Sequence, residues 1–174
     1  MGDGCLQEGV TSEAASLAWA QELGNLIAIY DDNDITIEGS TDLAFTEDPS
    51  ARFAAYGWQV LDVDWTGGGA GYEEDYAALR AALAAARAET TRPSLIRLRT
   101  VIAWPAPTKQ GQASSHGAKL GAQEVAGLKE ALGLDPRAGL PRPRRHPGLH
   151  PHPRRRARRR GRREIGRASC RERV

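Results

Sequence analysis

Hydrophobic and polar residues alternate in blocks along residues 1–135, and the length of each block predicts a strand or a helix. Short apolar runs between polar or turn-forming residues predict strands at 26–30, 58–63 and 94–101, and the first of these fits a strand buried on both faces. Longer stretches of helix-forming residues predict helices at 13–23, 49–56, 72–88 and 123–132. We expect Ser12 to cap the start of the first helix and Gly24 to end it.

The order of these elements predicts the fold class. Strands and helices that alternate at this spacing are typical of an α/β fold, in which a parallel sheet is flanked by helices. In the predicted helix at 72–88, an apolar stripe at helical spacing is expected to pack on the sheet; it consists of Tyr72, Tyr76, Leu79 and Leu83. Ligands of such sheets bind at the carboxyl ends of the strands, so the polar loop after residue 30 is a candidate site.

Charge divides the chain into two parts. Residues 1–135 hold nine Lys and Arg against twenty Asp and Glu, a net charge of −11. Residues 136–174 hold fifteen Arg against two Glu, a net charge of +13, and consist mainly of Arg, Pro, His and Gly. Because this second part has too few apolar residues to form a core, we predict one domain at 1–135 and a disordered basic tail at 136–174.

Cysteine content and hydropathy indicate the compartment. Cys5 and Cys170 are the only cysteines, which is too few for a disulfide framework and favours a reducing environment. The chain has no run of eighteen apolar residues, and its first residues lack the pattern of a signal peptide. We therefore expect a cytoplasmic protein without a membrane segment.

Two polar motifs could together hold a metal and a phosphate group. Gly2-Asp3-Gly4 is separated by 26 residues from Asp31-Asp32-Asn33, and Ile35 follows closely. Mg²⁺ prefers six oxygen ligands, of which Asp3, Asn33 and the Ile35 carbonyl could supply three, while diphosphate oxygens and water supply the others. Gly4 would let the backbone approach a phosphate. Taken alone, Gly-Asp-Gly is more typical of a plain turn.

The wider context of these motifs resembles one family. The pairing of the two motifs is similar to that in thiamine-diphosphate enzymes, and five blocks resemble transketolases in order and spacing, at 2–9, 26–33, 35–39, 56–58 and 115–118. The resemblance covers about residues 2–135 and implies an incomplete thiamine-diphosphate-binding fold, in which 1–135 is the C-terminal part of the diphosphate-binding domain. No strand precedes Gly2, so we expect the chain to be an internal fragment that begins within this fold.

The resemblance also implies roles for individual residues. Metal ligands would be Asp3, Asn33 and the carbonyl of Ile35; the metal would be Mg²⁺, with Ca²⁺ or Mn²⁺ as alternatives. Gly4 and Asn33 would contact the cofactor's diphosphate, and Ile37 would lie against its rings.

Two further residues match family positions outside the metal motifs. His116 would face the diphosphate and the substrate, where an imidazole can donate a hydrogen bond or carry a proton; a solvated loop histidine is the alternative. Glu8 would lie near a subunit interface that joins two active sites, with an exposed glutamate at a helix start as the alternative.

Two local features do not fit this scheme directly. Ala103 stands where the family usually has glycine, which questions the backbone path of that loop. Asp31, Asp32 and Asp34 crowd one loop, and either a bound cation or exposure to solvent could relieve their repulsion.

The resemblance implies an activity for the intact enzyme. Transketolases transfer a two-carbon ketol unit from a ketose phosphate to an aldose phosphate in the pentose phosphate pathway, as homodimers that bind thiamine diphosphate between subunits. The pyrimidine-binding domain and the phosphate-binding arginines of the family lie outside these 174 residues, so we expect this chain to be inactive alone. A related dihydroxyacetone synthase would share most of the same blocks.

The basic tail admits two interpretations. Its arginines could bind nucleic acid or another polyanion and carry the function themselves. Alternatively, a shifted reading frame, with vector or adapter sequence at 165–174, would produce the same composition. We favour the second interpretation, because the resemblance to transketolases stops near Asp135, where the composition changes.

Overall fold

A computed structural model describes residues 1–139, and residues 1–138 form one compact unit. Its centre is a parallel sheet of three strands, β1 (Ile27–Asp32), β2 (Gln59–Asp64) and β3 (Ser94–Arg99), in the order β1-β3-β2. β3 pairs with both neighbours, and Ile96 is level with Ile29 on one side and Leu61 on the other. The predicted α/β fold with a parallel sheet is confirmed.

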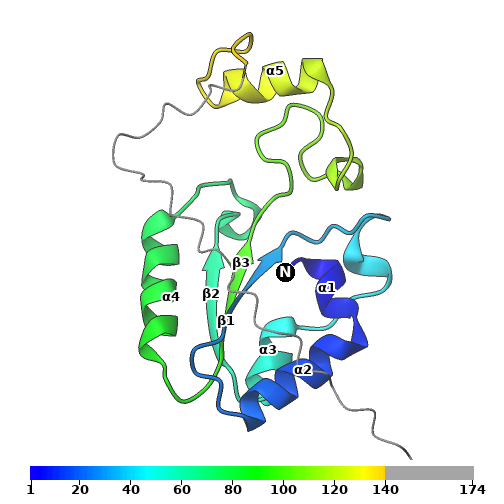
Figure 1. Ribbon diagram of the computed structural model, residues 1–174. Coiled ribbons are helices and arrows are strands. Elements are labelled where there is room, and N and C mark those ends of the chain that lie inside the picture. The colour runs from blue at the N-terminus through cyan, green and yellow to red at the C-terminus, as the bar shows by residue number, and fades with distance from the viewer. Residues whose placement is uncertain (140–174) are drawn as a thin grey trace, which may run out of the picture. The chain divides into compact units, whose positions relative to one another are not determined.

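Helices cover both faces of this sheet (Figure 1). These helices are α1 (Asp3–Gln7), α2 (Gly9–Ala20) and α3 (Pro49–Ala55) on one face and α4 (Tyr76–Ala88) on the other, while α5 (Ala122–Ala131) lies away from the sheet. Leu95 packs with residues of α1, α2 and α3, whereas Ile96 packs with Ala82 and Ala86 of α4. Because successive residues of a strand point to opposite faces, β3 is buried on both faces at Leu95 and Ile96.

The prediction that the strand at 26–30 is buried on both faces is wrong for part of its length. Leu26 and Ile29 are 38% and 39% exposed, although Tyr30 in the same apolar run is buried. The reason is position: within residues 1–139, β1 pairs along its length only with β3, so it is an edge strand of the sheet. The apolar run predicted the strand correctly but not its place in the sheet.

The first helical region differs from the prediction in its bounds. A separate short helix, α1, begins at Asp3, and α2 begins at Gly9 rather than residue 13, so Ser12 lies inside α2 and is not its N-cap. α2 ends at Ala20, and Glu22 then adopts a left-handed φ of 52°. Gly24 is needed for another reason: an added Cβ would lie 2.1 Å from the Thr90 carbonyl oxygen.

α4 begins later than predicted, because Asp75 caps it. The Asp75 carboxylate accepts a hydrogen bond of 2.8 Å from the Ala78 backbone N–H, so Tyr72 lies before the helix. Tyr72 packs instead against Trp104, with ring centroids 4.5 Å apart. Leu79 and Leu83 do pack toward the sheet, as the stripe predicted.

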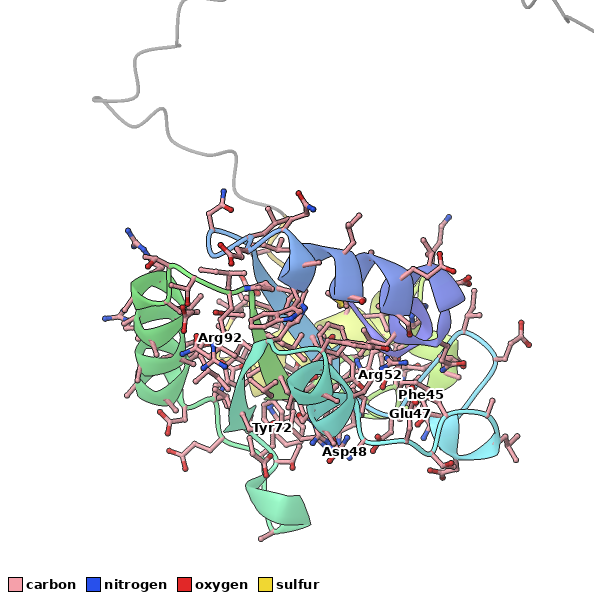
Figure 2. All side chains as sticks on the ribbon, turned by 90° about the horizontal axis from the view of Figure 1, so that it is seen from below. Phe45, Glu47, Asp48, Arg52, Tyr72 and Arg92 are labelled. Carbon is pink, nitrogen blue, oxygen red and sulfur yellow. The ribbon has the colours of Figure 1, made fainter. Side chains whose placement is uncertain are left out.

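Arg52 ties α3 to α1. Its Nη2 donates a hydrogen bond of 3.0 Å to the Leu6 carbonyl oxygen, while Nη1 lies 2.5 Å from a carboxylate oxygen of Glu47. Figure 2 shows Arg52 close to Phe45 and Glu47, and the guanidinium carbon is 5.7 Å from the centre of the Phe45 ring. This contact holds in place the helix that carries Asp3.

The loop at Ala103 has a backbone conformation that is unusual for alanine. Ala103 has a φ of 58°, a left-handed conformation that favours glycine. This conformation costs other residues about 1–2 kcal/mol, whereas the greater freedom of glycine in the unfolded chain offsets about 0.4–1 kcal/mol. We expect Ala103→Gly to raise the free energy of unfolding by up to about 1 kcal/mol, measured by urea denaturation.

The matched control for this prediction is Ala70→Gly. Ala70 is exposed and has an ordinary φ of −82°, so glycine there should only lower stability. If Ala103→Gly lowers stability as Ala70→Gly does, the left-handed alanine is not strained.

Two further sequence predictions concern the basic tail and the absence of a membrane segment. The basic tail predicted to be disordered at 136–174 lies, from residue 140 on, outside the described residues, so this stays a prediction. Among helices of the described part, none combines the length and apolar character that crossing a membrane requires.

Candidate functional site

The two polar motifs meet at the carboxyl end of β1. Met1 and Gly2 run parallel to β1. The Met1 amino group donates a hydrogen bond of 2.8 Å to the Ile29 carbonyl oxygen, and the Asp31 N–H donates one of 2.8 Å to the Met1 carbonyl oxygen. This pairing delivers Asp3 to the loop at 31–35. Residues thirty positions apart in the sequence therefore form one polar site, at the edge of the sheet where ligands of parallel sheets bind.

Asp3 is a buried carboxylate at the centre of this site. Its side chain is held at both oxygens: the Tyr30 hydroxyl donates to Oδ1 at 2.8 Å, and the Asn33 N–H donates to Oδ2 at 3.3 Å. The residue is 2% exposed, and this burial raises the pKa of Asp3, with the nearby Asp32 charge acting in the same direction. A buried carboxylate of this kind would be stabilised by a cation.

Two arginines neutralise the acidic loop. Asp32 accepts hydrogen bonds from Arg97 Nε at 2.6 Å and from Arg99 Nη1 at 2.7 Å, and Arg99 also pairs with Asp34. The Asp34 hydrogen bond raises the pKa of Arg99, which stays a cation. Neither a cation nor solvent is needed to relieve Asp32, which is 2% exposed; the arginines do so.

The carboxylates still form a compact group of oxygen donors. Asp3, Asp32 and Asp34 each offer an oxygen within 4.8 Å of the others. Asn33 lies among them. Its Oδ1 accepts a hydrogen bond of 3.1 Å from the Ile35 N–H, which keeps Asn33 and Ile35 close together. Among these carboxylates only Asp3 has no cationic partner in the described part of the chain, so Asp3, with the amide oxygen of Asn33, fits a hard divalent cation.

An open hollow of about 800 Å³ borders this loop. Its lining includes Asn33, Ile35, Asp64, Arg99, Val101 and Gly111. These residues follow or end all three strands. The hollow therefore lies at the carboxyl edge of the sheet, where the alternating pattern predicted a ligand.

The remaining predicted cofactor contacts are open to solvent. Gly4 lies in α1, and an added Cβ there would meet no atom within 4 Å. Ile37 follows the acidic loop and is 68% exposed. Both positions leave room for a ligand.

No side-chain hydrogen bond or ion pair among residues 1–139 links Glu8 or His116 to the acidic loop. Glu8 is exposed and lies between α1 and α2, where its carbonyl accepts the Thr11 N–H at 3.0 Å. His116 is exposed at the end of a 3₁₀ turn at Ala113–Ser115 and is not among the residues that line the hollow.

Sequence reasoning missed three residues of this site. Tyr30 was counted as part of an apolar strand, and Arg97 and Arg99 as part of another. Their spacing of two residues placed both arginines on one face of β3, which was the available signal. Nothing in the sequence indicated that this face would meet the acidic loop.

Comparisons with known proteins agree with this geometry. Residues 1–145 match the family model described as transketolase, thiamine diphosphate binding domain. A transketolase of Mycobacterium leprae is 52% identical over 134 residues, which cover 77% of this chain and 18% of that protein. Transketolase 1 of Saccharomyces cerevisiae is 47% identical over 136 residues, which cover 78% of this chain and 19% of that protein.

Solved structures give the same result. A Pichia stipitis transketolase in complex with sedoheptulose-7-phosphate superposes with a TM-score of 0.73 at 44% identity, over 81% of this chain and 20% of that one. A Campylobacter jejuni transketolase superposes with a TM-score of 0.71 at 43% identity, over 79% of this chain and 20% of that one. This chain spans about a fifth of the length of these relatives. From its matched sequence and fold, the chain belongs to the transketolase family.

Proposed function

We propose that residues 1–135 bind the diphosphate group of thiamine diphosphate together with a divalent cation, as part of a transketolase. The observation that carries this proposal is the meeting of Asp3 with Asn33 at the carboxyl end of β1, beside an open hollow. The family model for residues 1–145 supports the cofactor.

The ligand set follows from the oxygen donors of the site. The metal ligands are Asp3, Asn33 through its amide oxygen, and Ile35 through its carbonyl. Mg²⁺ is the preferred ion, because a diphosphate and one carboxylate suit its octahedral coordination; Ca²⁺ and Mn²⁺ share the same oxygen chemistry. Gly4 faces open space and allows the diphosphate to approach the backbone.

Other residues serve the remainder of the cofactor and the substrate. Ile37, with its exposed apolar side chain, lies against the rings of the cofactor. His116 donates a hydrogen bond to an anionic oxygen or moves a proton, as imidazole can near neutral pH. Glu8 lies at the interface of a homodimer.

The whole enzyme transfers a two-carbon ketol unit between sugar phosphates. When bound, thiamine diphosphate supplies the carbon centre that carries this unit, and the protein orients the reactants. Related Pichia stipitis structures hold sedoheptulose-7-phosphate and fructose-6-phosphate, which supports this substrate class. We place the enzyme in the cytoplasm.

The matched relatives favour transketolase over the two alternatives. The curated relatives quoted above are transketolases, whereas nothing in the described residues favours a polyanion-binding protein or a dihydroxyacetone synthase. Because the chain spans about a fifth of those relatives, we expect cofactor binding without ketol transfer.

Thermal unfolding tests this proposal. Adding millimolar Mg²⁺ and thiamine diphosphate together should raise the melting temperature of the chain, because a ligand present at 100 times its dissociation constant stabilises the folded state by about 2.7 kcal/mol. Either component alone should give a smaller rise, and EDTA should reverse it. An unchanged melting temperature in the presence of both would refute the proposed site.

A further inference from the structure

Tyr30 is a buried hydroxyl that reaches two carboxylates, and the predicted ligand set does not use it. Its oxygen lies 2.8 Å from Oδ1 of Asp3 and 3.1 Å from Oδ1 of Asp32, and the residue is 2% exposed. A tyrosine hydroxyl has only one hydrogen to donate. It can therefore form a full hydrogen bond with only one of these two carboxylates.

The surroundings of Asp32 decide which carboxylate receives this hydrogen. Asp32 already accepts charge-assisted bonds from Arg97 at 2.6 Å and Arg99 at 2.7 Å, so its negative charge is balanced. Asp3 has no ion-pair partner among residues 1–139; besides Tyr30, the Asn33 N–H donates to it over a longer 3.3 Å. The Tyr30 hydrogen therefore belongs to Asp3, the nearer and less satisfied carboxylate.

We propose that Tyr30 is a positioning residue for Asp3. Its hydroxyl fixes the carboxylate that binds the divalent cation, while Arg97 and Arg99 occupy Asp32 and keep it out of the ligand set. Partners of this kind orient metal ligands, and losing one typically weakens metal binding about 10- to 100-fold. The inference rests on the proposed function, because it assumes that Asp3 binds the cation.

The competing arrangement is a cation held directly by several carboxylates. The oxygens of Asp3, Asp32 and Asp34 lie within 4.8 Å of one another, which would allow it. In that arrangement Asp32 would itself be a ligand, and its removal would weaken metal binding. In the arrangement proposed here, removing Asp32 affects folding but not the metal.

A Mg²⁺ titration of the full chain at saturating thiamine diphosphate, followed by melting temperature and by calorimetry, tests the inference. Tyr30→Phe keeps the ring and removes the hydroxyl, and it should raise the half-maximal Mg²⁺ concentration about 10- to 100-fold. Tyr56→Phe is the matched control: Tyr56 packs edge-on against Phe53 at 5.9 Å, and its hydroxyl has no hydrogen bond within residues 1–139. This control should titrate as the wild-type chain does.

Asp32→Asn separates positioning from ligation and keeps the test decisive if Tyr30→Phe unfolds. We expect its Mg²⁺ midpoint to match that of the wild type, while the melting temperature of the cofactor-free chain falls because Arg97 and Arg99 lose their charged partner. If Asp32→Asn instead raises the half-maximal Mg²⁺ concentration about 10- to 100-fold, Asp32 is a metal ligand and the proposal is overturned.

The outcomes for the two proposals are distinguishable. A wild-type chain that gives no Mg²⁺-dependent change with thiamine diphosphate refutes the proposed function, and this inference with it. A wild-type chain that responds, together with a Tyr30→Phe variant that follows the same titration, refutes only the role of Tyr30.

Discussion

Asp3→Ala should abolish the rise in melting temperature that Mg²⁺ and thiamine diphosphate produce in the wild-type chain. Asp3 is the one carboxylate in the proposed ligand set, so its removal leaves the protein with only the neutral oxygens of Asn33 and Ile35 to offer the cation. The protein would then contribute no negative charge to hold the cation and the diphosphate together. The measurement is the melting temperature with and without both ligands.

The cofactor-free Asp3→Ala chain should remain folded, which separates loss of binding from loss of structure. Burial raises the pKa of Asp3, which means that folding disfavours the ionised carboxylate relative to its neutral form. Removing the carboxylate therefore removes an unfavourable contribution to the free energy of folding at neutral pH. Asp42→Ala, at an exposed aspartate of the 3₁₀ turn Thr41–Leu43, is the control and should keep the full rise. A persistent rise in Asp3→Ala would place the cation elsewhere.

Ile96→Ala should destabilise the chain by about 2–5 kcal/mol, the usual range for truncating a fully buried isoleucine. Ile96 is 0% exposed in the central strand and packs with Val63, Ala82 and Ala86. The alanines opposite it are too small to fill the resulting cavity, so a cost toward the upper part of this range is expected. Urea denaturation followed by circular dichroism measures it.

The control for this prediction is Leu43→Ala. Leu43 is 96% exposed, so its truncation should change the free energy of unfolding by no more than about 0.5 kcal/mol. Equal effects of the two substitutions would mean that the face of β3 toward α4 is not a packed core.

Local sequence patterns predicted the main elements because each pattern has a local physical cause. The strand at 94–99 follows from an apolar run, and the helix at 49–55 from Pro49 in its first turn, preceded by Asp48, whose carboxylate accepts hydrogen bonds from the Ser50 and Ala51 N–H groups. The same reasoning failed at the start of α4, where the apolar step from Tyr72 to Tyr76 suggested a continuous helix but the Asp75 cap begins it later.

The residues of the candidate site rest on a resemblance as well as on local patterns. The resemblance to transketolases implies Asp3, Asn33 and the Ile35 carbonyl as metal ligands, and their oxygen chemistry suits a divalent cation. Tyr30 was not identified, since a tyrosine within an apolar strand usually contributes only packing. Its hydrogen bond to Asp3 spans 27 residues, and no local pattern contains such a contact.

The sequence by itself determined the alternation of strands and helices, the acidic character of residues 1–135 and the oxygen donors of the candidate metal site. These properties depend on residue type and on spacings of a few residues. Only the tertiary structure decided that β1 is an edge strand, that Asp3 is buried, and that Arg97 and Arg99 neutralise Asp32. The place of β1 and the arginine contacts depend on β1 and β3 meeting in register, with partners 65 or more residues apart. The burial of Asp3 depends on its contact with Tyr30, 27 residues away, and packing of the whole domain sets both.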